Sequence, residues 1–116
     1  MGKLQIKVVQ AVFYKNSAGT EPVRDWLMEM DAADRKIIGT DIRTVEMGWP
    51  IGMPVCRPMG DGLYEVRSNI IGGIARVLFC AHHGKMVLLH GFVKKSQKTP
   101  DGDLALARKR KKEVER

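Results

Sequence analysis

Cysteine, aromatic residues and long apolar runs are all scarce in this sequence of 116 residues. Only Cys56 and Cys80 are present, and their spacing does not fit a C-x-x-C motif for zinc or redox chemistry. No apolar run approaches the length that spans a membrane, and residues 1–12 lack the apolar core of a signal peptide. We therefore expect a cytoplasmic protein with two reduced thiols, no membrane association, no metal and no cofactor.

Positive charge is what the sequence has in excess. Lys and Arg number 20 against 13 Asp and Glu, which gives a net charge of +7. Residues 94–116 alone contain nine basic and four acidic residues, which indicates either a nucleic-acid surface or a solvated helix. The 44% apolar content is typical of a globular protein, and we expect residues 1–116 to form one domain.

Periodicity predicts the element order. Alternating apolar residues that include Leu4 and Ile6 predict an opening strand up to residue 14. Helical spacing then predicts two helices, over residues 20–30 with Thr20 as the cap and over residues 31–47 with Glu46 facing water. Residues 51–62 contain glycines and two prolines without periodicity and are expected to form a loop.

Three further strands are expected at residues 63–67, 74–79 and 86–93, followed by a basic helix over about residues 100–116. Short glycine-containing connections imply antiparallel pairing. The sequence therefore predicts an α+β domain (β-α-α-β-β-β) in which two helices pack on one face of a small, mostly antiparallel sheet, with a C-terminal helix. The opposite face of the sheet is expected to be less covered.

Charged residues gather on that second face. Side chains alternate along a strand, so Glu65 and Arg67 share a face, and pairing with the next strand adds Arg76. One interpretation is a cross-strand ion-pair cluster on a solvated sheet. The other is a phosphate-binding site, because the cations outnumber the carboxylate and guanidinium groups fork onto phosphate oxygens. RNA is the polyanion that we favour. Placement of Arg67 and Arg76 on opposite faces of the sheet, or their burial in neutralising carboxylate pairs, would rule out a nuclease site.

Phosphodiester transfer within RNA is the chemistry that suits such a site. A ribose 2′-hydroxyl loses a proton and attacks the adjacent phosphorus, and the leaving 5′-oxygen is protonated. Arg67 and Arg76 are expected to stabilise the charge on the phosphorane, and replacement of Arg76 by alanine is expected to abolish activity with the fold intact. A lysine crowded by like charges can act as base or acid, for which Lys94, Lys95 and Lys98 are candidates. This route needs no metal.

Other residues have both structural and functional interpretations. His90 lies among apolar residues and is interpreted as a half-buried structural histidine, with an acid–base role as the alternative. Glu65 is a further acid–base candidate. The candidate RNA-binding residues, which could also be no more than a solvated helix end, are Lys98, Arg108, Lys109, Arg110, Lys111 and Lys112.

Three segments in order carry a resemblance to a known family: residues 62–67 (GLYEVR), 75–79 (ARVLF) and 89–100 (LHGFVKKSQKTP). Together with Trp26 and Leu27 of the first expected helix, they resemble the phage-derived Gp49-like branch of HigB toxins, within the RelE/ParE superfamily of toxin–antitoxin systems. The resemblance covers almost the whole chain. It implies a RelE-like fold and ribosome-dependent cleavage of messenger RNA.

The resemblance also implies partners and site residues. The partners are the ribosome with its messenger RNA, a cognate antitoxin, typically a helix-turn-helix HigA-like protein, and operator DNA for the toxin–antitoxin complex only. Arg76 matches an arginine that RelE-type toxins use to stabilise phosphate, Arg67 takes a basic position, and Lys94 and Lys95 fall near another. Glu65 replaces a lysine of the RelE pattern and no tyrosine follows Lys95, so the general base is not assigned.

Two other functions remain open from the sequence. The chain could be a non-catalytic, ParE-like toxin that binds and inhibits DNA gyrase, or an inactive RNA-binding relative. The convergence of basic residues at strand ends favours the nuclease, because a toxin that blocks a protein does not need convergent phosphate ligands.

Overall fold

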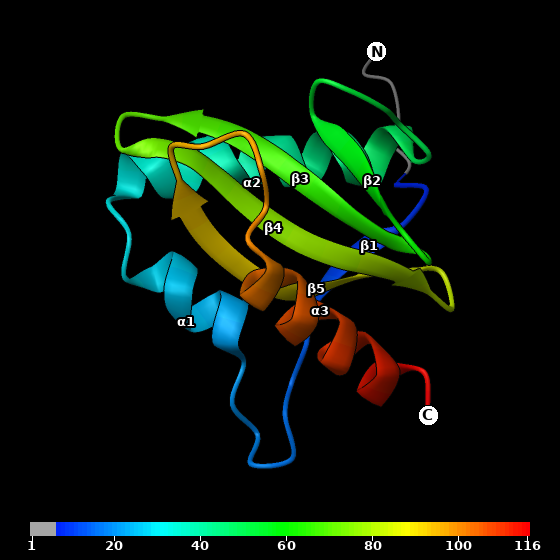
Figure 1. Ribbon diagram of the computed structural model, residues 1–116. Helices are drawn as coiled ribbons and strands as arrows, with labels where there is room; N and C mark the ends of the chain where they lie inside the picture. Colours follow the sequence, from blue (N-terminus) through cyan, green and yellow to red (C-terminus); the bar gives the residue numbers. More distant parts are fainter. Residues whose placement is uncertain (1–6) are drawn as a thin grey trace.

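The computed structural model describes residues 7–116, which form a sheet with helices on both faces (Figure 1). The elements are β1 (Gln10–Phe13), α1 (Pro22–Met28), α2 (Ala32–Gly48), β2 (Cys56–Gly60), β3 (Leu63–Ile70), β4 (Gly73–His82), β5 (Lys85–Lys94) and α3 (Asp101–Val114). The strand order is β1-β5-β4-β3-β2, with β1 parallel to β5 and every other pair antiparallel. The predicted α+β class is confirmed.

Each face of the sheet buries its own apolar cluster. The cluster beneath α1 and α2 contains Val23, Leu27, Ile38, Ile42, Val45, Val66, Val77 and Phe79. The cluster beneath α3 contains Leu63, Leu78, Cys80, Leu89 and Ala107. The second face is therefore more covered than the sequence predicts, because α3 folds back across it. The alternation along β3 and β4 that assigns residues to the two faces is confirmed.

The segment expected to be a loop at residues 51–62 contains strand β2, so that prediction was wrong in part. Pro58 and Gly60 disturb the apolar periodicity by which a strand is recognised. Proline is nevertheless tolerated in β2, because this strand lies at the edge of the sheet and pairs on one side only. At the other boundaries, Glu21 rather than Thr20 occupies the position before α1. Leu4 and Ile6 lie outside the described residues.

Glu46 is buried, which corrects the prediction that it faces water. Its side chain accepts a hydrogen bond from the backbone N–H of Ala11 at 2.7 Å and lies 3.2 Å from Lys7 Nζ. The carboxylate thus satisfies a backbone donor of β1 and ties this strand to α2. Helical periodicity alone could not reveal this role, because it depends on a strand 35 residues away.

Gly91 of β5 lies directly beneath the ring of Trp26 from α1. A Cβ atom at this position would lie 2.4 Å from a ring atom of Trp26, so Gly91→Ala should lower the free energy of unfolding by about 1–3 kcal/mol. Gly39→Ala in exposed α2 is the matched control, because its Cβ meets nothing within 4 Å and alanine should stabilise the helix by up to about 1 kcal/mol. Urea unfolding followed by circular dichroism measures the free energy of unfolding of both variants. A Gly91→Ala protein with an unchanged free energy of unfolding would contradict this close packing.

Cys56 and Cys80 are free thiols buried in the two apolar clusters. Burial raises the pKa of each to about 11, so little reactive thiolate is present at neutral pH. Within residues 7–116, no group of three or more His, Cys, Asp and Glu side chains could hold a metal ion. In the same range, no helix has the length and apolar character needed to cross a membrane.

Candidate nucleic-acid interface

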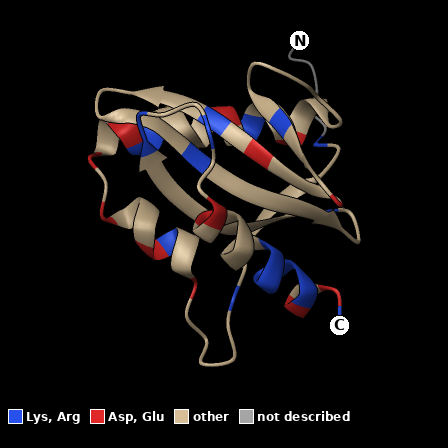
Figure 2. Ribbon diagram, viewed as in Figure 1, with Lys and Arg blue, Asp and Glu red and all other residues tan. Residues whose placement is uncertain are grey.

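Three arginines and one carboxylate meet on the face of the sheet that α3 partly covers. Arg67 of β3 pairs directly with Arg76 of β4, and in the adjacent row Glu65 pairs with Arg57 of β2. Basic and acidic positions consequently lie side by side across these strands (Figure 2). The prediction that Glu65, Arg67 and Arg76 share a face is confirmed. Arg57 was missed, because it was assigned to a loop.

The chain between β5 and α3 crosses this face in front of β4 (Figure 1). We call residues 95–99 of this connection the strap. All three arginines donate hydrogen bonds to it, so the arginine cluster holds the strap against the sheet. The bonds run from Arg76 to Ser96 O and to Thr99 Oγ1 (3.4 Å), from Arg57 to Gln97 O (3.5 Å), and from Arg67 to Gln97 Oε1 (2.7 Å).

Arg76 is completely buried beneath the strap, which corrects the prediction of an exposed arginine. Its guanidinium carbon lies 6.0 Å from the centre of the Phe92 ring. Burial lowers the pKa of Arg76, and the nearby Glu65 carboxylate opposes this effect. In this arrangement a phosphate group reaches Arg76 only if the strap moves.

Glu65 is also fully buried and lies within this hydrogen-bonded network. One oxygen accepts a hydrogen bond from Thr99 Oγ1, and the other lies 3.6 Å from Arg67 Nε. Among the described residues, Glu65 forms an ion pair with Arg67, whereas Arg57 is its cross-strand neighbour and Arg76 only feels its charge, so the three arginines are only partly neutralised. An acid–base role for Glu65 stays a prediction, and the strap separates this carboxylate from solvent.

The exposed cations of the site lie along the strap and at its start. Lys94, Lys95 and Lys98 are exposed, as expected for residues at and after the end of the last strand. Arg67 has a side chain that is 12% exposed. These four residues, rather than Arg76, are the predicted site residues that a ligand can contact directly while the strap is in place.

His90 has a partner on α3. Its Nε2 lies 2.6 Å from Asp103 Oδ1, and its ring stacks on that of Phe92 at 5.5 Å. An irregularity in the pairing of β4 with β5 places both Leu89 and His90 on the α3 side. The geometry matches the structural interpretation of this histidine, and its acid–base role stays a prediction.

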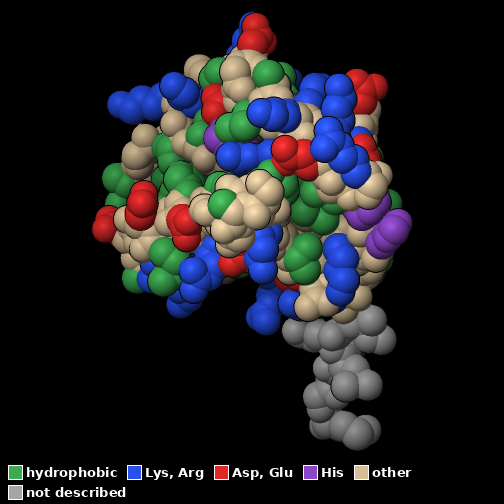
Figure 3. Space-filling view, turned by 90° about the horizontal axis from the view of Figure 1, so that it is seen from below, with side chains coloured by type: hydrophobic (Ala, Val, Ile, Leu, Met, Phe, Trp, Pro, Cys, Tyr) green, Lys and Arg blue, Asp and Glu red, His purple; other side chains and the backbone are tan. Residues whose placement is uncertain are grey.

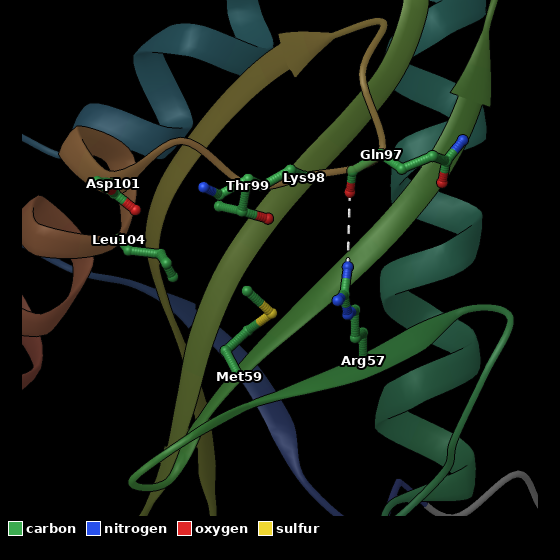
Figure 4. A pocket seen from close by; sticks show the side chains of 7 residues that line it. All are labelled: Arg57, Met59, Gln97, Lys98, Thr99, Asp101 and Leu104. Atoms are coloured by element: carbon green, nitrogen blue, oxygen red, sulfur yellow. Dashed lines mark hydrogen bonds between the residues drawn. The ribbon is translucent and has the colours of Figure 1, made fainter.

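A hollow of about 390 Å³ lies beside the strap (Figure 4). Strand β2 contributes Arg57 and Met59, the strap contributes residues 97–99, and the first turn of α3 contributes Asp101 and Leu104. Its lining thus combines basic, acidic and apolar side chains. This volume lies within the range of about 300–1,000 Å³ that is typical of small-ligand sites.

The basic run of α3 is divided between internal and exposed side chains. Arg108 donates to Met59 O at 3.0 Å, and Arg110 donates to Leu89 O at 2.8 Å. These two arginines therefore anchor α3 to the sheet, which reduces their availability for the predicted RNA contacts.

The lysines of this run point elsewhere. Lys109 and Lys112 are exposed, whereas Lys111 pairs with Glu115 at 2.7 Å. The face of the molecule in Figure 3 shows basic side chains interspersed with acidic and apolar ones. The clearest concentration of positive charge is therefore local, around the strap and along the second half of α3 (Figure 2).

Comparison with known proteins assigns the family. No curated protein matches the chain. The family model described as phage derived protein Gp49-like (DUF891) matches residues 25–112, which is 88 of the 116 residues and includes the arginine cluster, the strap and most of α3. The chain belongs to the phage-derived Gp49-like protein family.

Proposed function

We propose that this protein is the toxin of a toxin–antitoxin pair and that it cleaves messenger RNA on the ribosome. The observation that carries the proposal is the convergence of six cations on the strap and its hollow, against the two carboxylates of Glu65 and Asp101. These eight residues together carry a net charge of +4, which favours the binding of a polyanion. The resemblance of this Gp49-like chain to HigB and RelE toxins supports the same activity. The cations are Arg57, Arg67, Arg76, Lys94, Lys95 and Lys98.

The reaction would proceed by attack of a ribose 2′-hydroxyl on the adjacent phosphorus. The 2′-oxygen gives up its proton, forms a bond to phosphorus, and displaces the 5′-oxygen, which takes up a proton. The products are a 2′,3′-cyclic phosphate and a 5′-hydroxyl. Arg67 would stabilise the negative charge of the phosphorane, because its side chain is partly exposed and its guanidinium can exchange the hydrogen bond to Gln97 for one to a bound phosphate.

The other cations would divide the remaining tasks. Lys94, Lys95 and Lys98 are exposed and are the candidates for moving protons. Arg76 would act as a positioning residue, because it touches the strap rather than the solvent. The exposed Lys109 and Lys112 would contact the backbone of ribosomal RNA, which provides affinity without sequence choice.

The proposal includes the expected partners. A cognate antitoxin, a helix-turn-helix HigA-like protein, would neutralise the toxin, and the complex of the two would bind operator DNA. The ribosome as target would place the action of the toxin in the cytoplasm.

A second candidate function is favoured by the burial of Arg76. The nuclease mechanism expected from the sequence uses both Arg67 and Arg76 as phosphate ligands. With Arg76 beneath the strap, only Arg67 of these two is accessible to a phosphate. A ParE-like toxin that inhibits DNA gyrase, or an RNA-binding relative without activity, does not require an accessible arginine at this position.

Induction of the chain in cells separates these functions. Cells sampled before and after induction are compared for the 5′ ends of their messenger RNA, for plasmid supercoiling and for RNA that co-purifies with the chain. New in-frame cuts with 5′-hydroxyl ends support the nuclease. Intact transcripts with altered supercoiling support gyrase inhibition, and intact transcripts with normal supercoiling but RNA bound to the chain support the inactive relative.

A further inference from the structure

The hollow beside the strap contains a residue that phosphate binding does not explain. Asp101 presents a carboxylate there, although Arg57 and Lys98 line the same hollow. A carboxylate repels a phosphate group. An ionised carboxylate accepts hydrogen bonds but cannot donate them, so it favours a ligand edge that carries donors.

Apolar side chains in the hollow point to the same kind of ligand. Met59 from β2 and Leu104 from α3 are both partly buried and line it from different elements (Figure 4). A phosphate gains nothing from such contacts, whereas the face of a nucleobase does. The Arg57 guanidinium, held by its hydrogen bond to Gln97 O at 3.5 Å, supplies a planar group on which a base can stack.

The four RNA bases differ in what they offer to a carboxylate. Guanine carries two adjacent donors, N1–H and the N2 amino group, so one carboxylate can accept from both. Adenine and cytosine place an acceptor nitrogen next to their amino group, and uracil flanks its single N–H with two carbonyl oxygens. Guanine is therefore the one base whose Watson–Crick edge complements Asp101.

We propose that this hollow is a base-specificity site that takes a guanine next to the cleaved bond, with Asp101 reading its donor edge and Met59 and Leu104 contacting its face. This inference rests on the proposed function, because RNA must be the substrate for a base-reading site to matter. Asp101 also lies in the first turn of α3, where the helix dipole stabilises a negative charge. This structural role explains the carboxylate, but it explains neither Met59 and Leu104 nor the hollow.

Binding of the four nucleoside 5′-monophosphates to the full chain tests the site without cleavage. Their phosphate and ribose are the same, so differences in affinity report the base alone. Guanosine monophosphate should bind about 5- to 150-fold more tightly than the others and shift the Met59 methyl resonance in nuclear magnetic resonance spectra. Asp101→Asn should remove this preference. Asp41→Asn, on α2 at the opposite face of the sheet, should keep it.

Cleavage on ribosomes programmed with messages that differ in one base gives the second readout. Asp101→Asn should slow cleavage of the guanine-containing message and leave the other three unchanged. An equal slowing of all four messages would assign Asp101 to proton transfer instead and overturn the inference. Equal binding of the four nucleotides would overturn the base-specificity site but leave the proposed nuclease activity standing. A preference for guanine without any cleavage would support the site and reject the nuclease activity.

Discussion

Replacing Arg67 with alanine should lower the rate of messenger RNA cleavage on ribosomes by about 10²–10³-fold, the usual cost of losing one group that stabilises a developing negative charge. Arg67 is the arginine of the cluster that is both predicted from the sequence and partly exposed in the structure. The fold should persist, because Glu65 keeps its hydrogen bond from Thr99 and the neighbouring charge of Arg76.

Cleavage of a defined message by purified protein and ribosomes measures this effect, with the melting temperature recorded for each variant. Arg67→Lys should recover part of the rate, since it keeps the charge but loses the forked geometry. Arg43→Ala, an exposed arginine of α2, is the matched control and should cleave at the normal rate. A folded Arg67→Ala protein with full activity would rule out the proposed role of this side chain.

Replacing Arg76 with methionine should destabilise the protein by about 3–5 kcal/mol, because it leaves the buried Glu65 with less compensating charge. The strap also loses its two hydrogen bonds from Arg76. Because Arg76 is buried, we no longer expect its removal to leave the fold intact, as the sequence alone suggested. Adding Glu65→Gln to the same protein should restore part of the loss, since the buried charge is then gone.

Two measurements check this prediction. Urea unfolding gives the free energies for both single variants and the double variant, and their non-additivity reports the coupling of Arg76 to Glu65. Limited trypsin digestion reports the strap, because Lys95 and Lys98 are cleavage sites that should be cut faster when Arg76 is absent. A methionine variant with normal stability and a protected strap would show that Arg76 does not hold this segment.

Much of the sheet could be predicted from local patterns of apolar and polar residues in the sequence. The alternation in residues 63–67 and 74–79 placed Arg67 and Arg76 on one face, because successive side chains point to opposite sides and a short connection makes the strands antiparallel. The same local reasoning missed Arg57, because Pro58 and Gly60 in the same strand interrupt the pattern by which an edge strand is recognised. The available signal was weak: Arg57 directly follows the apolar Cys56 and stands two residues before Met59.

The sequence by itself determined the class of the domain, the face on which the charged residues gather and the excess of positive charge around residues 94–98. These depend on properties of neighbouring residues: apolar period, turn chemistry and charge. Only the tertiary structure decided which cations meet solvent. Arg76 is buried by a strap 20 residues further along, and Arg108 and Arg110 are engaged because α3 folds back on the sheet. Burial depends on which distant segments cover a residue, and local periodicity does not contain that information.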